Sequence, residues 1–424
     1  MSVAELPLTR RLIPKLLWER AFRRYWTAQT ISLLGDQVTL LAIPLLAVLG
    51  AGAGPAQMGY LTAAGLVPHL LFSLLAGAWM DKLPYKRLSM IIADVFRALL
   101  LLWVPVSYAL GTLTLTQLYV VAFLTGTFSV IFEVSRNTLF AALVSKDDYI
   151  PAETLLNGAR ALSYVAGPSI GGVLIQVLSA PVALIADAVS YLYSAFLLKK
   201  VEAVEPAPQP SEKLGIGEGL RYIWHSLLLR NMLAGTTTLN LFNYMFSALV
   251  LLYISIDLHL SPGIIGLVIG AASVGALIGA SVTGRLVAKF GSGPMLIVGY
   301  VLFPAPLVLV PLATGSQPTV VIIALLFAAE FLSGFGVMVL DILAGSFQIA
   351  AVPDALRARV AGAYRTVNYG IRPIGALIGG ALGSSLGTRE TLWISAIGAV
   401  AGALWLLPAG VWRMRELPDV VDQV

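Results

Sequence analysis

Long apolar stretches separated by short polar segments run through almost the whole chain. Twelve of them are roughly 17–25 residues long, which is the length that an α-helix needs to cross the hydrocarbon core of a bilayer. The pattern therefore predicts an all-α membrane protein with 12 transmembrane helices and leaves no room for a soluble catalytic domain. We place the spans at 25–49, 58–80, 88–110, 117–143, 154–178, 182–198, 231–256, 263–287, 294–313, 319–341, 359–383 and 391–411.

The composition narrows the possible chemistry. Hydrophobic residues make up 58% of the chain and charged residues 12%, whereas about a quarter of the residues are charged in a soluble domain. The chain has no cysteine, and its three histidines lack the spacing of metal ligands. It also has no phosphate-binding G-x-x-x-x-G-K-[ST] loop, nucleophile elbow or H-E-x-x-H helix. We therefore expect neither an enzyme nor a cofactor or metal site, and we expect energy from an ion gradient or from the substrate's own gradient.

Lys and Arg are distributed unevenly between the two sides that the predicted spans define. Of the 27 basic residues, 21 fall on the side that carries both termini. Positive charge in short loops marks the cytoplasmic side, so we expect both termini in the cytoplasm and a multi-pass protein of the bacterial inner membrane. The net charge of +5 comes from these loops, and we therefore do not expect a nucleic-acid partner.

The longest polar stretch, 199–226, divides the predicted spans into six and six. An internal repeat supports this division, because an offset of 207 residues aligns Gly59 with Gly266 and an offset of 205 aligns Arg160 with Arg365. Two six-helix halves around a mid-membrane cavity are the plan of the major facilitator fold. The predicted units are a cytoplasmic N-terminal amphipathic segment (1–24), an N-terminal bundle (25–198), a cytoplasmic linker (199–230), a C-terminal bundle (231–411) and a cytoplasmic tail (412–424).

The polar loop after the second span resembles the signature G-x-x-x-D-[RK]-x-G-[RK]-[RK] of the facilitator superfamily, with Pro84 and Tyr85 in place of Gly and Arg. The resemblance implies that Asp81 caps a helix of the other half in one conformation, which suits an anion beside a helix N-terminus. The alternative is a topology signal that needs positive charge only. We assign conformational gating to Gly77, Asp81, Lys82, Lys86 and Arg87.

Small residues gather in the fifth span, where Gly167, Pro168, Gly171 and Gly172 resemble a signature of the antiporters of this superfamily. Small side chains let helices approach closely, and a proline removes a backbone donor and softens the helix. We assign these four residues to a helix-packing motif that suggests export. The alternative is ordinary packing, because Gly and Pro are common in membrane helices.

Charged residues inside the spans are expensive, at roughly 2.5–3.5 kcal/mol each on insertion scales, so they normally face water or a partner. Near the cytoplasmic ends, Asp94 and Arg97 are spaced i, i+3, as are Glu133 and Arg136, and Arg160 begins the fifth span. This spacing lets each pair partly neutralise. We interpret the five residues as a structural and gating network.

Three carboxyl groups lie deeper in the spans: Asp36 in the first, Asp187 in the sixth and Glu330 in the tenth. Since burial disfavours the charged form of an acid, such groups can take up and release a proton near neutral pH. We predict proton coupling by these residues, with Asp36 first and Glu330 second. The alternative for Asp36 is a hydrogen bond between helices. Polar candidates for a substrate cavity are Tyr164, Asn240, Asn243, Tyr244, Tyr369 and Arg372.

Three further stretches, 25–37, 132–136 and 185–191, resemble the bacterial multidrug and macrolide efflux branch of the superfamily, which includes enterobactin exporters. The resemblance covers nearly the whole chain and is stronger in the first half. It implies proton-coupled export of small amphiphilic compounds (drug, macrolide or siderophore-like) by alternating access, with Asp36 at the cavity. The expected partners are a small-molecule substrate, protons and the lipid bilayer, and we expect a monomer.

Two other functions remain open. An importer or a uniporter of a small metabolite would accumulate its substrate in whole cells, and a uniporter would be indifferent to uncouplers. A non-transporting membrane scaffold would tolerate replacement of its cavity acids, but it would leave the insertion cost of those acids unexplained.

Overall fold

The computed structural model describes residues 15–80, 85–202 and 216–418, without the side chains of 73–80 and 216. Within these ranges the chain is helical and contains no β-strand. The helices of the first half are α2 (Arg20–Leu49), α3 (Pro55–Met80), α4 (Lys86–Ala109), α5 (Leu115–Leu143), α6 (Tyr149–Leu178) and α7 (Ala180–Lys199). Those of the second half are α8 (Ile216–His225), α9 (Leu227–Leu252), α10 (Pro262–Phe290), α11 (Ser292–Leu302), α12 (Leu309–Leu312), α13 (Thr319–Ala351), α14 (Arg357–Leu386) and α15 (Thr388–Val400).

Nine helical segments of the described part are long and apolar enough to cross a membrane. The other predicted spans, 58–80, 359–383 and 391–411, fall on α3, on α14, and on α15 with the 3-10 turns that follow it. α14 is less apolar because arginines interrupt it, among them Arg365 and Arg372. The all-helical membrane architecture that the apolar stretches predict is confirmed.

Besides the span 391–411, where α15 ends at Val400 and 3-10 turns follow, two predicted spans differ clearly from the helices of the described part. The span 294–313 is interrupted, because α11 ends at Leu302 and a 3-10 turn leads to the short α12. Pro304 and Pro306 lie at this break, and a proline has no backbone N–H with which to continue α-helical hydrogen bonding. The span 319–341 is too short, since α13 continues to Ala351.

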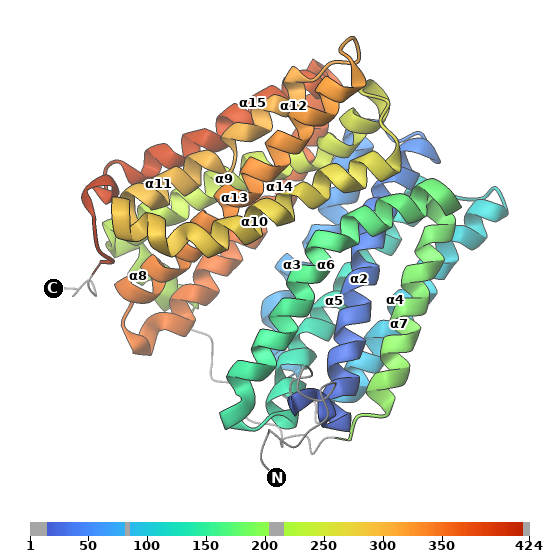
Figure 1. The fold of residues 1–424 in the computed structure, drawn as a ribbon, viewed down its shortest axis with the longest axis horizontal. Helices are drawn as coiled ribbons and strands as arrows, with labels where there is room; N and C mark the ends of the chain where they lie inside the picture. Colours follow the sequence, from blue (N-terminus) through green and yellow to red (C-terminus); the bar gives the residue numbers. More distant parts are fainter. Residues whose placement is uncertain (1–14, 81–84, 203–215, 419–424) are drawn as a thin grey trace, which may run out of the picture.

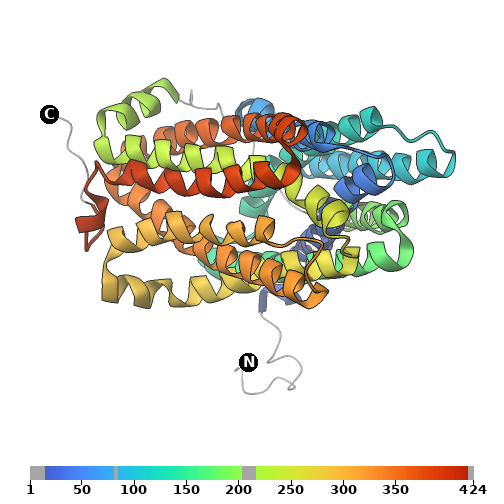
Figure 2. The ribbon, with the colours of Figure 1, turned by 90° about the horizontal axis from the view of Figure 1, so that it is seen from above.

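The helices form two groups (Figure 1). In the first group, α2 packs against α6 and α7, α5 packs against α3 and α4, and α4 also contacts α7. In the second group, α10 and α11 pack against α13, and α9 packs against α14 and α15. Figure 2 shows the same two groups from above, with the first at the right and the second at the left. Each group therefore encloses its own interior.

The two groups converge at one end and diverge at the other (Figure 1). At the converging end, which we call the closed end, α3 packs against α14 and α6 packs against α10. A Cβ placed on Gly59 would lie 2.9 Å from the Cα of Gly380, and one placed on Gly172 would lie 3.0 Å from the Cα of Gly266. The start of α2 and the end of the described chain lie at the diverging end, which we call the open end.

The buried apolar clusters follow this arrangement. One cluster, at the closed end, contains residues of both groups, such as Leu45 of α2 and Ile265 of α10. Toward the open end each group has a cluster of its own, which includes Leu139 in the first group and Phe347 in the second. The groups thus share a core at one end only.

Candidate functional site

The site is built around the middle of α2, where a glycine precedes an aspartate. Gly35 is buried, and a Cβ on it would collide with the side chains of Asp187 and Ser190 on α7. The missing side chain therefore lets α7 approach α2 closely. Asp36, one residue further around the helix, keeps its side chain 36% exposed.

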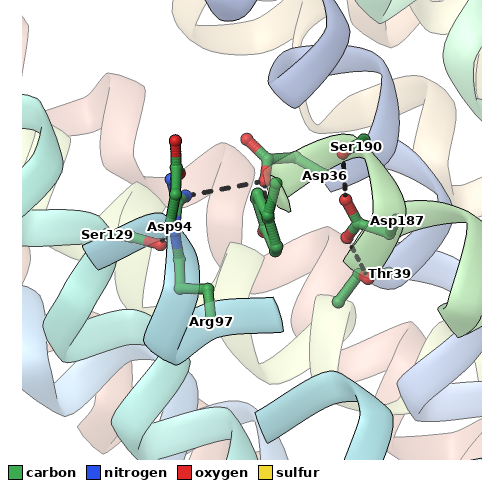
Figure 3. A network of polar contacts seen from close by, with 8 residues as sticks. Asp36, Thr39, Asp94, Arg97, Ser129, Asp187 and Ser190 are labelled. Atoms are coloured by element: carbon green, nitrogen blue, oxygen red, sulfur yellow. Dashed lines mark hydrogen bonds and ion pairs between the residues drawn. The ribbon is translucent and has the colours of Figure 1, made fainter. Parts of the chain in front are cut away.

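Two other helices hold the carboxylate of Asp36 (Figure 3). The hydroxyl of Tyr191, on α7, donates a hydrogen bond to Asp36 Oδ1 at 2.5 Å. Arg97 Nη1, on α4, lies 3.9 Å from the same oxygen. Hydrogen bonds and ion pairs to a charged acceptor are stronger than neutral ones, so these contacts position Asp36 while part of its surface stays open.

Arg97 is the buried cation of the site. Its guanidinium forms an ion pair with Asp94, one turn earlier on α4, and donates to Ser129 Oγ at 3.4 Å (Figure 3). The guanidinium also lies over the rings of Phe132, at 4.6 Å, and Tyr191, at 4.1 Å. Arginine stays charged in proteins. Arg97 therefore remains a cation beside Asp36 and Asp94 whether or not either acid carries a proton.

Asp187 lies inside the first group and has no exposed surface. Thr39 of α2 donates to one of its oxygens, and Ser190 donates to the other at 2.9 Å (Figure 3). No cation of the described chain lies within ion-pair distance of it. Its contacts hold α7 to α2, and solvent does not reach it as it reaches Asp36.

The other charged residues within the spans are arranged differently from the pair Asp94 and Arg97. The i, i+3 spacing gives an ion pair between Asp94 and Arg97, but Glu133 is exposed and forms none with Arg136. Arg136 instead lines a cavity with Arg160, apart from the network around Asp36. Glu330 is half-buried on α13 and has neither a hydrogen bond nor an ion pair with a described residue.

Some of the predicted cavity residues come together in the second group. The guanidinium of Arg372 lies 4.5 Å from the ring of Tyr369 and 5.2 Å from that of Tyr244. The ring of His69, on α3 of the first group, is 6.2 Å from that of Tyr369. Polar and aromatic side chains of both groups thus meet around Arg372.

The other cavity candidates are separate from this cluster. Asn240 donates to Asn368 at 2.9 Å, and this tie joins α9 to α14. Asn243 is half-buried without a hydrogen bond to a described residue. Tyr164 is 47% exposed, and its backbone carbonyl accepts a hydrogen bond from Ser273 of the second group at 2.7 Å.

Only part of the motif in the loop after α3 lies within the described residues. Asp81 and Lys82 lie outside the described residues, and the surroundings of Gly77 are outside them as well. Lys86 is buried at the start of α4, and Arg87 donates to the backbone carbonyl of Val201. This contact ties the start of α4 to the segment that follows α7.

The small-residue motif of α6 faces two neighbours. A Cβ on Gly167 would collide with Gln37 of α2, and one on Gly171 would lie 3.2 Å from the Cα of the next α2 residue, Val38. Gly172 instead faces Gly266 of α10, in the second group. Pro168 is buried within α6. The motif therefore lies between the core of the first group and the contact of the two groups.

Several residues that hold the site together are not recognisable as site residues from the sequence. Tyr191 and Ser190 on α7 and Phe132 on α5 contact the charged network, although none of them is a charged residue within a span. They fall within the segments 132–136 and 185–191, whose resemblance to efflux transporters was the available signal. Thr39 and Ser129 gave no signal, because neither is unusual in an apolar helix.

Comparisons with known proteins agree on the kind of molecule. The family described as transmembrane secretion effector matches residues 15–420. The multidrug efflux pump Tap of Mycolicibacterium fortuitum is 29% identical over 210 residues, 47% of this chain and 51% of that protein. The MFS-type transporter YfiS of Bacillus subtilis is 28% identical over 220 residues, 50% of this chain and 51% of that protein. These matches span about half the length of each relative.

Solved structures share the fold at low identity. A bacterial homologue of the iron transporter ferroportin, in an inward-facing state, has a TM-score of 0.73 at 14% identity and covers 93% of this chain and 98% of its own. A POT family transporter has a TM-score of 0.72 at 12% identity, with 94% and 98% covered. The nucleoside transporter NupG has a TM-score of 0.69 at 12% identity, with 93% and 99% covered. These structures show the fold, and the family match over residues 15–420 shows that the chain belongs to the transmembrane secretion effector family of major facilitator superfamily transporters.

Proposed function

We propose that the protein exports small amphiphilic compounds, drug, macrolide or siderophore-like, by proton antiport with alternating access. The observation that carries the proposal is the position of Asp36, whose carboxylate is 36% exposed while Tyr191 and Arg97 contact it. An acid that solvent and substrate can both reach is a suitable proton carrier, and its partners keep it in place. The multidrug efflux activity in the name of the relative Tap supports the direction of transport.

The charges around Arg97 suggest how a proton and a substrate exchange. Asp36 and Asp94 are two acids that face one guanidinium, so the cluster carries a net negative charge when both are ionised. A proton on Asp36 makes the cluster neutral, while Arg97 keeps its ion pair with Asp94. The proton and a substrate with a polar or cationic group therefore compete for the same exposed carboxylate. This competition is the coupling step of an antiporter.

Alternating access would use the two groups of helices as moving bodies. We assign the N-terminal bundle to 25–198 and the C-terminal bundle to 231–411, joined by a cytoplasmic linker over 199–230. Twelve spans with both termini in the cytoplasm would place the open end on the cytoplasmic side of a bacterial inner membrane. The separate cores at that end support bodies that rock without unfolding. We take the working unit to be a monomer.

The test is proton release from energised inside-out vesicles when candidate amphiphiles are added. The parent should release protons in response to a substrate, and Asp36→Asn should abolish the response at unchanged expression. Asp354→Asn is the matched control, because Asp354 is 87% exposed in a pair with Arg357. A response that persists in Asp36→Asn would transfer the coupling role to Glu330 or Asp187. Substrate movement that is insensitive to an uncoupler would overturn antiport in favour of a uniporter.

A further inference from the structure

A polar cavity lies in the first group, and Asp36 is not among the residues that line it. It has a volume of about 160 Å³ and is lined by residues of α2, α5 and α6. α2 contacts both α5 and α6, and the exposed lining residues Asn137 and Glu153 show that the cavity between these helices opens to the surface. Gln29, one of its lining residues, is seven positions before Asp36, which is about 10 Å along the helix toward the open end.

The lining is rich in hydrogen-bond donors. Arg136 of α5 and Arg160 of α6 both face the cavity, and neither forms an ion pair with a described residue. Gln29 of α2 is 2% exposed, and its Nε2 has no hydrogen-bond partner in the described chain. A buried donor without a partner is rare and destabilising. Three helices therefore direct donors toward one small space, and among these donors only Arg160 has a hydrogen-bond acceptor in the described chain, the side chain of Asn157.

The hydrogen-bond acceptors near the cavity either already have a donor within the chain or are fewer than the donors. The hydroxyl of Tyr25 donates to the backbone carbonyl of Arg136 at 3.2 Å. Glu153 lines the cavity but is exposed, and it accepts from Asn157 of its own helix at 3.5 Å. Asn157 in turn accepts from Arg160 at 3.2 Å. The lining residues of the cavity thus include two guanidinium groups and one carboxylate, so their net charge is positive.

We propose that this cavity binds a phosphate group, carried either by an anionic phospholipid or by a soluble phosphorylated solute. A guanidinium matches two phosphate oxygens at once. The non-ester oxygens of a phosphate group each carry several lone pairs, so one phosphate can accept from both arginines and from the Gln29 amide. The bound group links α2, α5 and α6 near the open end. The proposal does not depend on the direction of transport or on the proton coupling at Asp36.

The experiment uses the full-length protein purified in a maltoside detergent, which contains no phosphate. One arm measures the binding of radiolabelled inorganic phosphate by equilibrium dialysis. The other arm measures the melting temperature after addition of phosphatidylglycerol or, for comparison, phosphatidylcholine. The variants are Arg136→Gln, Arg160→Gln and Gln29→Leu. The control is Arg365→Gln, which removes an exposed arginine from the aligned position of α14.

Saturable phosphate binding that Arg136→Gln and Arg160→Gln weaken about tenfold or more, and that Arg365→Gln leaves unchanged, supports a soluble source. A melting temperature raised by phosphatidylglycerol alone, in the parent and the control but not in the arginine variants, supports the lipid source. No response to either ligand, or equal responses in parent and variants, overturns the proposal. If the arginine variants do not fold, Gln29→Leu and Arg160→Lys decide, since each alters one donor set and retains the positive charge of the cavity.

Discussion

Replacement of Gly59 by alanine is expected to open the closed end of the molecule. A Cβ on Gly59 would lie 2.7 Å from the backbone oxygen of Ala376 and 2.9 Å from the Cα of Gly380. Ordinary contact begins at 3.4 Å, so α3 and α14 must separate by about 0.7 Å. Both obstructing atoms belong to the backbone and cannot rotate away.

The magnitude follows from the cost of overpacking, which is typically about 1–3 kcal/mol. The contact between α3 and α14 exists where the two groups meet, so the cost falls on the conformation closed at this end. A bias of this size changes the ratio of two conformations by about 5- to 150-fold. Gly65→Ala is the matched control, because it is the same substitution on the same helix with open space around its Cβ.

The assay is a distance measurement between spin labels on Thr112 and Ser316, two exposed loop residues at the closed end, one in each group. The chain has no cysteine, so both labels can be introduced by cysteine substitution without removing others. Gly59→Ala should shift the distribution toward longer distances, and Gly65→Ala should not. An unchanged distribution in Gly59→Ala, in protein of parental melting temperature, would refute the idea that this glycine contact holds the closed end.

Three other substitutions have defined outcomes. Asp94→Asn removes the ion pair of the buried Arg97 with Asp94, leaves it only the 3.9 Å contact with Asp36, and should destabilise the protein by about 3–5 kcal/mol. Asp354→Asn, in an exposed pair, should cost less than about 1 kcal/mol. Thermal unfolding in detergent compares the two variants, and equal losses would contradict the stabilising role of the buried pair. Gly35→Ala should lower the melting temperature because its Cβ meets the α7 side chains, and Gly158→Ala, which has open space, should not. Arg372→Leu removes the cation held between two tyrosine rings, so efflux assays should show a greater loss for anionic than for cationic amphiphiles; an equal loss for both would contradict a substrate-facing Arg372.

Helix positions were predictable because they depend on the length and polarity of local stretches. The helix break at Pro304 was not predicted. The apolar stretch there is long enough for one span, and its polarity does not change where the backbone hydrogen bonding changes. Spacing alone was a poor guide to ion pairs. Asp94 and Arg97 pair because both are buried, while Glu133 and Arg136, at the same spacing, do not pair. Local sequence determines which residues share a helix face, but burial decides whether two opposite charges on that face form an ion pair.

The contacts of Asp36 show a second limit. Asp36 was recognisable as an isolated charge in an apolar span, but its partners Tyr191 and Arg97 come from helices far along the chain. Their meeting depends on how closely α7 approaches α2, and that depends on the missing side chain at Gly35. A single sequence contains no signal for such a distance, so the acid could be identified and its environment could not.

The three apolar cores also bear on where new transport behaviour can arise by mutation. A change in the cluster around Leu139 or around Phe347 alters the folding of one bundle and leaves the contact between bundles intact. A change in the shared cluster, at Leu45 or Ile265 for example, alters the balance between conformations as well. Variants with altered turnover and unaltered substrate preference should therefore concentrate in the cluster that both groups share. Substitutions in the two clusters that belong to one group each should mainly change the amount of folded protein.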